Sequence, residues 1–177
     1  MLSVETSNRQ AALPHEAHNT FFIQPATSPE DLIDVASLFE AYAQSLNIDL
    51  SFQNFSTELS DLPGKYGPPS GALLLTRRKD TNKAIGCVGL RPLDIKGVCE
   101  MKRLYVAPEG RGSALGKALV KQVIEEAKRI GYRFMRLDTL GSMREARGLY
   151  KNLGFVERKS YYDTPIEGTV FLELDLS

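Results

Sequence analysis

Apolar residues recur at helical spacing in two long segments of the chain. In residues 28–47, a Ser-Pro-Glu start precedes apolar side chains three and four positions apart, which predicts an amphipathic helix capped by Ser28. In residues 114–130 the apolar stripe lies opposite Lys, Gln and Glu, and Gly131 ends the segment. That stripe consists of Leu115, Ala118, Leu119, Val123, Ala127 and Ile130.

Two shorter helices are also predicted. Residues 142–153 begin with Ser142 and Glu145 at the spacing of a capping box and end before Gly154. Residues 55–62 are compatible with one short helix, and a Pro- and Gly-rich loop follows as far as Gly71. A loop of this length and composition often shapes a binding site.

Seven runs have the composition of strands: residues 20–26, 72–78, 84–93, 98–106, 132–140, 156–162 and 169–177. The links after 78 and 93 are short and turn-like, which favours antiparallel hairpins. Strands alternating with helices in this order predict an α/β domain with one mixed sheet. The length suits one domain over residues 20–177, preceded by a flexible polar tail at 1–19.

Composition removes several function classes. The 22 basic and 22 acidic residues cancel, so bulk charge implies neither a nucleic-acid partner nor an anionic membrane. No run approaches the roughly eighteen apolar residues of a membrane span. Residues 1–18 lack the features of a secretory or transit peptide, so we expect a soluble cytoplasmic protein.

Histidine and cysteine usage narrows the possible chemistry further. Both histidines, His15 and His18, lie in the predicted tail, so the domain has no histidine for a nucleophile–histidine pair or for a metal site. Cys87 and Cys99 lie in apolar surroundings, and we interpret them as buried thiols. We therefore expect no metal.

A glycine-rich segment at 106–119, "VAPEGRGSALGKAL", joins a predicted strand to a predicted helix. A nucleoside-triphosphate P-loop requires Ser or Thr after Gly-Lys, but Ala118 follows Gly116-Lys117. A dinucleotide-binding turn would need its first glycine directly after the strand and further βαβ units, which the remaining sequence does not provide. Neither nucleotide design fits.

A third design fits better: a [QR]-x-x-G-x-[GA] loop whose helix N-terminus receives a pyrophosphate. Residues 111–116 match it with Ala114 in place of the first glycine. The small residues are needed there because the ligand lies against the backbone. A loop that is small only in order to turn is the alternative.

Two stretches in this region resemble a known family. "CEMKRLYVAPEGRGSALGKALV" resembles the cofactor-binding motif of the GNAT superfamily of N-acetyltransferases, and "SMREARGLYKNLGFVE" resembles its second motif, which ends in L-Y-x-x-L-G-F. The resemblance follows residues 20–176 in element order and is specific over 99–157. It implies a GNAT-like mixed, mostly antiparallel twisted sheet of six to seven strands with about four helices, splayed between the fourth and fifth strands, with acetyl-CoA in the split.

The resemblance also implies roles for individual residues. Glu100 occupies the position of a glutamate general base; alternatively, it is a strand carboxylate paired with Lys102 or Arg91. Tyr150 matches the tyrosine that protonates the CoA sulfur; alternatively, it is a core aromatic. The implied cofactor-binding residues are Leu104, Tyr105, Val106, Arg111, Gly112, Ser113, Ala114, Leu115, Gly116 and Lys117, and the first three correspond to a bulged strand segment. Asp138, Glu58 and Asp61 are reserve candidates for the base.

Met143 departs from the family pattern, because a polar residue that contacts CoA commonly stands there. The acceptor is expected near 47–70 and 158–168, where acidic and aromatic residues suit a small-molecule amine or an amino acid. A protein or peptide acceptor, or a CoA-binding module without turnover, are the alternatives. A monomer and a homodimer are both compatible with the sequence.

Overall fold

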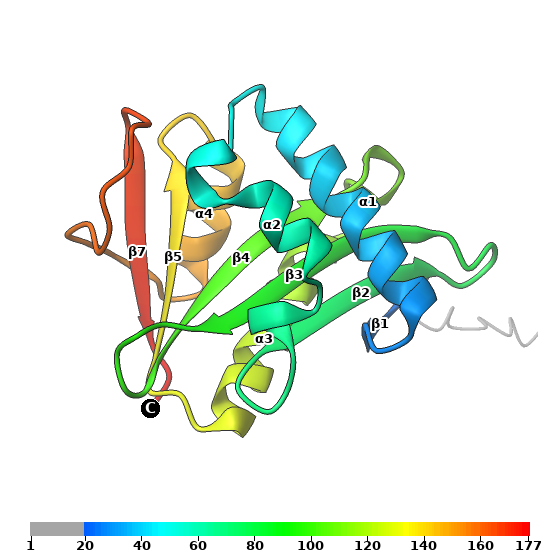
Figure 1. Ribbon diagram of the computed structural model, residues 1–177, viewed down its shortest axis with the longest axis horizontal. Coiled ribbons are helices and arrows are strands. Elements are labelled where there is room, and N and C mark those ends of the chain that lie inside the picture. The colour runs from blue at the N-terminus through cyan, green and yellow to red at the C-terminus, as the bar shows by residue number, and fades with distance from the viewer. Residues whose placement is uncertain (1–19) are drawn as a thin grey trace, which may run out of the picture.

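Seven strands form one sheet in the computed structural model, which describes residues 20–177 (Figure 1). Their order across the sheet is β1-β2-β3-β4-β5-β7-β6, and only β4 and β5 run parallel to each other. The expected mixed, mostly antiparallel sheet is confirmed, and the predicted tail at 1–19 lies outside the described residues. The strands are β1 (Phe21–Pro25), β2 (Ala72–Arg78), β3 (Ala84–Pro92), β4 (Val98–Val106), β5 (Phe134–Leu140), β6 (Val156–Arg158) and β7 (Thr169–Asp175).

Helices cover both faces of this sheet. In Figure 1, α1 and α2 lie in front of the strands, whereas α3 and α4 lie behind them. The serine predicted to cap α1 does so: the Ser28 hydroxyl accepts from the amide of Asp31, whose carboxylate accepts from the amide of Ser28. The helices are α1 (Pro29–Leu46), α2 (Phe55–Ser60), α3 (Leu115–Ile130) and α4 (Arg144–Asn152), with 3-10 turns η1 (Ser51–Gln53), η2 (Gly64–Tyr66) and η3 (Pro108–Gly110).

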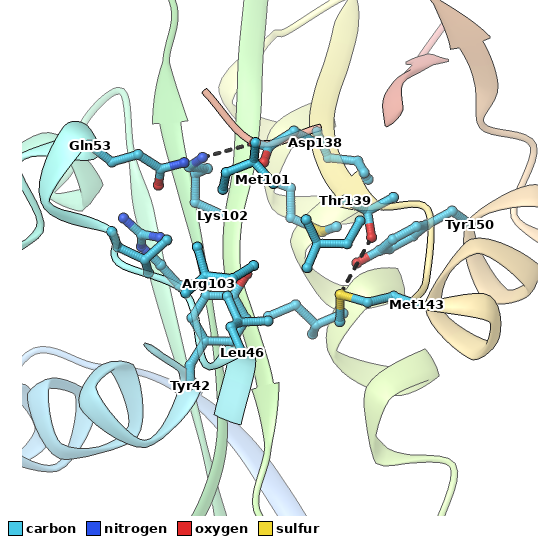
Figure 2. A pocket seen from close by; sticks show the side chains of 16 residues that line it. Tyr42, Leu46, Gln53, Met101, Lys102, Arg103, Asp138, Thr139, Met143 and Tyr150 are labelled. Atoms are coloured by element: carbon cyan, nitrogen blue, oxygen red, sulfur yellow. Dashed lines mark hydrogen bonds and ion pairs between the residues drawn. The ribbon is translucent and has the colours of Figure 1, made fainter. Parts of the chain in front are cut away.

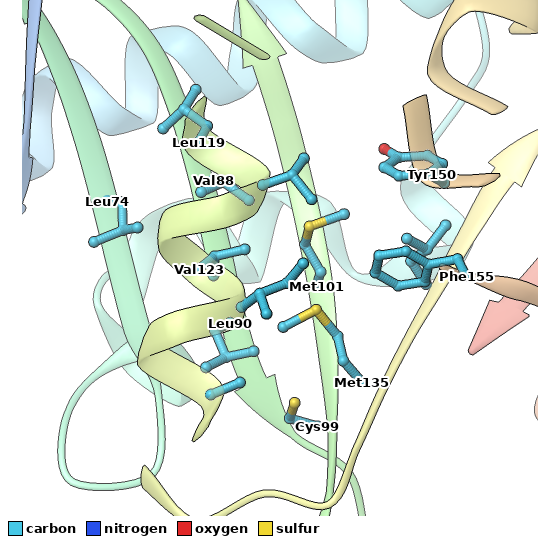
Figure 3. Close-up of a cluster of buried hydrophobic side chains, with 14 of the residues drawn as sticks. Leu74, Val88, Leu90, Cys99, Met101, Leu119, Val123, Met135, Tyr150 and Phe155 are labelled. Atoms are coloured by element: carbon cyan, nitrogen blue, oxygen red, sulfur yellow. The ribbon is translucent and has the colours of Figure 1, made fainter. Parts of the chain in front are cut away.

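The larger core lies between the sheet and α3. Four residues of the predicted stripe of α3 are buried, and the other two, Ala118 and Ile130, are partly buried against the same core. Leu119 and Val123 are fully inaccessible to solvent. Figure 3 shows these two side chains facing Val88 and Met101 on the neighbouring strands. Tyr150 and Phe155 extend the same cluster toward α4. Burial of this apolar surface fixes α3 across β2, β3 and β4.

A smaller core lies on the opposite face, beneath α1. It contains Phe39 from α1, Tyr66 from η2 and Leu75 from β2. The ring of Tyr66 lies directly over Gly89 on β3, where a Cβ atom would approach the ring to within 2.6 Å. A glycine is therefore required at this position for Tyr66 to pack against the sheet.

The parallel pair β4–β5 is short. Only Val98–Glu100 of β4 pair with Phe134–Arg136 of β5, although both strands continue well beyond these residues. The sheet therefore splits between its fourth and fifth strands, as the family resemblance implied, and Figure 1 shows the two ribbons diverging. No strand of residues 20–177 lies beside Met101–Val106 on the edge that faces β5.

Two local predictions were wrong. Ser142 does not cap α4: the N-cap is Met143, which has no side-chain hydrogen bond to the helix, and the amide of Arg144 instead bonds to the carbonyl of Ser142 in a tight turn. The strand predicted at 156–162 ends at Arg158. Beyond it, Tyr161 and Tyr162 leave the ladder and pack around Phe171.

No helix within residues 20–177 is both long and apolar enough to cross a membrane.

The contact between Tyr66 and Gly89 yields a stability prediction. We expect Gly89→Ala to lower the free energy of unfolding by about 1–3 kcal/mol, because the added methyl group overlaps the Tyr66 ring. Urea denaturation followed by circular dichroism measures this. Gly148→Ala in α4 is the matched control, since its Cβ would meet nothing within 4 Å, and it should raise stability by about 0.5–1 kcal/mol. An unchanged midpoint for Gly89→Ala would contradict the assigned packing.

Candidate active site

A cleft opens where β4 and β5 separate. Figure 2 shows side chains from α1, β4, β5 and α4 around this cleft. Its walls are apolar at Leu46, Leu137 and Met143 and polar where Lys102 and Asp138 face each other. The remaining lining residues are Tyr42, Ile48, Leu50, Gln53, Met101, Arg103, Leu104, Thr139, Leu140, Tyr150 and Ile166.

Strand β4 is distorted at the wall of this cleft. The pairing between β3 and β4 shifts register opposite Val88, and Arg103 has a φ of 58°, which is unusual for a residue with a side chain. This marks a β-bulge at residues 103–104. The bulge that the resemblance implied at 104–106 is thus present, but it begins one residue earlier. Both residues of the bulge, Arg103 and Leu104, line the cleft.

The glycine-rich loop leads from β4 to the N-terminus of α3. Gly112 has a φ of 77°, and Ala114, the N-cap, has a φ of 58°. No side chain caps this helix, and the first intrahelical bond runs from the amide of Ala118 to the carbonyl of Ala114. The amides of residues 115–117 therefore precede the helical ladder at its positive end. Such an arrangement can receive an anion.

Gly116 stands at the start of α3 without a packing reason within the described chain. A Cβ atom at this position would meet only Val106, at 3.9 Å, so nothing in the described chain requires glycine there. Glycine in the first turn of a helix also costs stability relative to alanine, by about 0.5–1 kcal/mol. The space beside the backbone of Gly116 is therefore open to a ligand.

Tyr150 projects from α4 into the inner end of the cleft. Its ring packs edge-to-face on Phe155, with centroids 5.6 Å apart, and its hydroxyl makes no hydrogen bond to residues 20–177. Burial, together with the nearby Tyr42 and Asp138, raises the pKa of Tyr150 above its usual value. The hydroxyl therefore keeps its proton at neutral and moderately alkaline pH. Tyr150 is both a core aromatic and a potential proton donor.

Glu100 lies behind the cleft wall rather than on it. Its side chain is only 1% exposed, and one carboxylate oxygen accepts a hydrogen bond of 2.8 Å from Arg91 Nε and lies 2.8 Å from Nη2 of the same guanidinium in an ion pair. The other oxygen accepts from the hydroxyl of Tyr161 at 2.7 Å and lies 4.0 Å from Lys102 Nζ. Both cationic pairs considered from the sequence are thus present. Any proton transfer to Glu100 has to pass through a mobile partner such as water or Tyr161.

An ion pair spans the gap between the two strands. Lys102 Nζ on β4 lies 2.8 Å from an oxygen of Asp138 on β5 (Figure 2), at a place where the strands no longer share backbone hydrogen bonds. Asp138 is 18% exposed and lines the cleft, whereas Glu100 does not. Of the reserve candidates for the base, Asp138 is the one that reaches the cleft.

A second ion pair, which is buried, links β4 to α2. Arg103 donates two bonds, of 2.9 and 2.8 Å, to Glu58 on α2, which also accepts from the hydroxyl of Tyr66 at 2.8 Å. Burial raises the pKa of Glu58, but the bonds and charge of Arg103 outweigh this effect, so the pKa is lowered overall. We did not predict a role for Arg103 from the sequence. The available signal was a second cation in a strand whose other residues are mostly apolar.

Among the described residues, no three His, Cys, Asp or Glu side chains are placed so that they could hold a metal ion. Cys87 and Cys99 are buried, as expected, and burial raises the pKa of each thiol; that of Cys99 rises to about 12. Neither sulfur lines the cleft. The ionisable groups at the cleft are therefore lysine, arginine, aspartate and tyrosine.

Comparison with known proteins assigns this architecture to a family. The family model of the acetyltransferase (GNAT) family matches residues 35–155. An uncharacterized N-acetyltransferase of Schizosaccharomyces pombe is 44% identical over 149 residues, which cover 84% of this chain and 91% of that protein. An uncharacterized N-acetyltransferase of Dictyostelium discoideum is 33% identical and covers 83% of this chain and 95% of its own length.

Solved structures share the fold. A GNAT-family acetyltransferase from Staphylococcus aureus superposes with a TM-score of 0.73 at 21% identity, covering 89% of this chain and 99% of its own. A structure from Salmonella typhimurium, described as a putative acetyltransferase with its cofactor acetyl-CoA, gives 0.62 at 20% identity and covers 89% of this chain and 95% of its own. The match over residues 35–155 and the relative at 44% identity together show that the chain belongs to the acetyltransferase (GNAT) family and is an N-acetyltransferase.

Proposed function

We propose that the protein transfers the acetyl group of acetyl-CoA to the amine of a small-molecule acceptor by direct attack in the β4–β5 cleft. Two observations carry this proposal: the N-terminus of α3, which follows β4 through the glycine-rich loop, has no side-chain cap, and the cleft beside β4 is lined by Tyr150, whose hydroxyl has no partner within residues 20–177. The acetyl-CoA bound to the Salmonella typhimurium neighbour supports the choice of cofactor. A cytoplasmic location and a monomeric or homodimeric state remain predictions.

The cofactor would be held mainly by backbone. The amides of residues 112–117 would receive the pyrophosphate, and Arg111, exposed beside them, would add a positive charge. The bulged strand at Leu104, Tyr105 and Val106 would bond to the pantetheine arm, since no strand lies on that edge. Ala114, already at positive φ, would present its amide rather than its methyl group.

The reaction forms one bond and breaks one. The amine nitrogen attacks the thioester carbonyl carbon, a C–N bond forms, and the C–S bond breaks as the sulfur leaves. The sulfur takes a proton from Tyr150, and the amine must lose a proton to attack, because an alkylammonium has a pKa of about 10 and no free lone pair. Backbone amides at the bulge could stabilise the developing oxyanion.

A carboxylate is the natural acceptor for the amine proton. Glu100 remains our first candidate, acting through water because its oxygens are bound by Arg91 and Tyr161. Asp138 is the second candidate, because it lines the cleft directly and its partner Lys102 could hold the proton-accepting oxygen in place. Under the first assignment, substitution of Glu100 should impair removal of the amine proton; under the second, substitution of Asp138 should do so.

The small size of the acceptor is inferred from the wall that α2 forms. Arg103 and Tyr66 hold Glu58, and with it α2, against the sheet, which narrows the approach to the cleft. An extended peptide would need an open groove along this wall. We therefore favour a small molecule over a protein or peptide.

Gly116→Val tests the cofactor assignment. We expect it to weaken acetyl-CoA binding by at least about tenfold, because the new side chain occupies space next to the loop backbone that the pyrophosphate needs. Calorimetric titration with acetyl-CoA measures the affinity. Gly148→Ala is the control, and it should bind normally. Unchanged affinity in Gly116→Val would show that the pyrophosphate lies elsewhere.

A panel of amines, amino acids, aminosugars and peptides tests the activity itself, with release of free CoA as the readout. We expect CoA release with at least one small amine and a fall in kcat of about 10²-fold or more in Tyr150→Phe, which keeps the ring packing on Phe155 but removes the proton. Because the pKa of Tyr150 is raised, wild-type kcat should not fall on the alkaline side before about pH 10. Binding of acetyl-CoA without release with any amine would indicate a non-catalytic module instead.

Glu100→Gln and Asp138→Asn separate the two candidate bases. In the variant that lacks the base, the acid limb of the pH–kcat profile should move to higher pH, because free amine is then supplied only by the acceptor's own loss of a proton, with a pKa of about 10. The other variant should keep that limb in place even if its overall rate changes. If both profiles match that of the wild type, neither carboxylate is the base.

A further inference from the structure

A second pocket lies beside the cleft, on the side of α2. Gln53, on turn η1, lines both spaces, and the buried Arg103–Glu58 pair stands between them, with Arg103 on the cleft and Glu58 on the second pocket. We call this second space, whose walls include Glu58, Tyr66 and Arg91, the side pocket. It lies in the region where the sequence places the acceptor. Its polar groups therefore bear on which acceptor fits.

Arg91 offers an unused edge to the side pocket. Its Nε donates a hydrogen bond to one oxygen of Glu100 and its Nη2 lies beside the same oxygen in an ion pair, both at 2.8 Å, so the edge that carries Nε is occupied. The opposite edge, formed by Nη1 and the second hydrogen of Nη2, makes no hydrogen bond or ion pair within residues 20–177. The side chain is 28% exposed and lines the pocket. Two parallel N–H groups of this kind match the two oxygens of a carboxylate.

The other charges of the side pocket do not oppose an anion there. Glu58 is turned toward Arg103 and Tyr66, which satisfy it. Asp61 and Lys65 stand at the exposed rim and carry opposite charges, so they offset each other. Glu100 is buried against the far side of Arg91. The free edge of Arg91 is therefore the polar feature of the pocket best suited to a charged ligand.

Gln53 supplies a complementary group between the two spaces. Its Oε1 atom is buried and has no hydrogen-bond partner in the described chain. Figure 2 shows its side chain extending from the η1 turn toward β4. A buried carbonyl oxygen without a donor costs free energy that an N–H group of a ligand would recover. A ligand that bridges the two spaces is thus expected to carry an N–H donor at this point.

We infer that the acceptor is an amine that also carries a carboxylate, in the manner of an amino acid. Its carboxylate binds the free edge of Arg91, an N–H group donates to Gln53 Oε1, and the amine to be acetylated reaches the cleft near Asp138. This inference rests on the proposed function. It narrows the acceptor to one class, because simple amines and aminosugars lack the group that Arg91 would bind.

Kinetics with a matched pair of acceptors test the inference: an amino acid that the enzyme acetylates and its carboxamide. The measured quantity is kcat/KM for the acid divided by kcat/KM for the amide. This ratio should be about 10- to 100-fold lower in Arg91→Gln than in the wild type, since the charged, two-bond contact is lost in the variant. Arg91→Lys, which keeps the charge without the fork, should fall between them. The amines of the acid and of the amide differ in basicity, but this difference cancels when the acid-to-amide ratio is compared between the wild type and the Arg91 variants.

The ratio also separates recognition from catalysis. A general loss of rate, caused by disturbing Glu100, lowers both values and leaves the ratio unchanged, and Arg91→Lys decides the question if Arg91→Gln does not fold. Arg129→Gln, at an exposed site on α3, is the matched control and should keep the wild-type ratio. If the wild type uses acid and amide equally well, or if the acid-to-amide ratio is unchanged in both Arg91 variants, the inference is overturned but the proposed function is not. Absence of transfer to every amine overturns the proposed function and the inference together.

Discussion

The early end of the β4–β5 ladder is the constraint on which the site depends. Three residue pairs join the two strands, and beyond them β4 must satisfy its free edge by other means. In a continuous sheet this edge would be covered by the next strand. Here it borders a cleft, and the bulge at Arg103 lies in the wall of that cleft. The opening for a ligand is thus a gap in the sheet's own hydrogen bonding.

Charged side chains in and around this opening are arranged as pairs. Lys102 with Asp138, Arg91 with Glu100 and Arg103 with Glu58 each match one cation to one carboxylate near the protein interior. An unpaired charge at such a depth would be costly, and pairing removes most of that cost. The Lys102–Asp138 pair also joins the strands where backbone bonds no longer do. Structural and chemical roles therefore overlap in the same side chains.

The sequence predicted the fold well because its strongest signals are local. The periodic apolar stripe of α3 and the short links around β3 need no tertiary information to be read. The predicted cap at Ser142 was wrong because a capping-box spacing also occurs in tight turns. The predicted strand at 156–162 was too long because strand-like composition does not reveal that the side chain of Tyr161 bonds to Glu100. The pairing of Glu100 with Arg91 and Lys102 was considered from the sequence, but that of Arg103 with Glu58, which join different elements, was not.

The candidate site was only partly predictable for the same reason. The loop and Tyr150 carry sequence motifs, so their placement followed from the family resemblance. Whether Glu100 or Asp138 faces the cleft depends on how two strands diverge, and no spacing within one strand encodes that angle. The importance of Arg103 arises from the bulge, which becomes visible only as a positive φ.

The attachment of α2 bears on how this enzyme could evolve. The helix has only six residues and none of them is fully buried, yet Thr57 and Glu58 from it line the side pocket. Its position depends on Glu58, which is anchored to a strand by Arg103 and to the neighbouring turn by Tyr66. Tyr66 must stay because it also packs on the sheet, but the exposed positions from 47 to 70 could diverge without disturbing that contact. If the acceptor binds there, as proposed, changes in this surface segment would alter the acceptor while leaving the acetyl-transfer core intact.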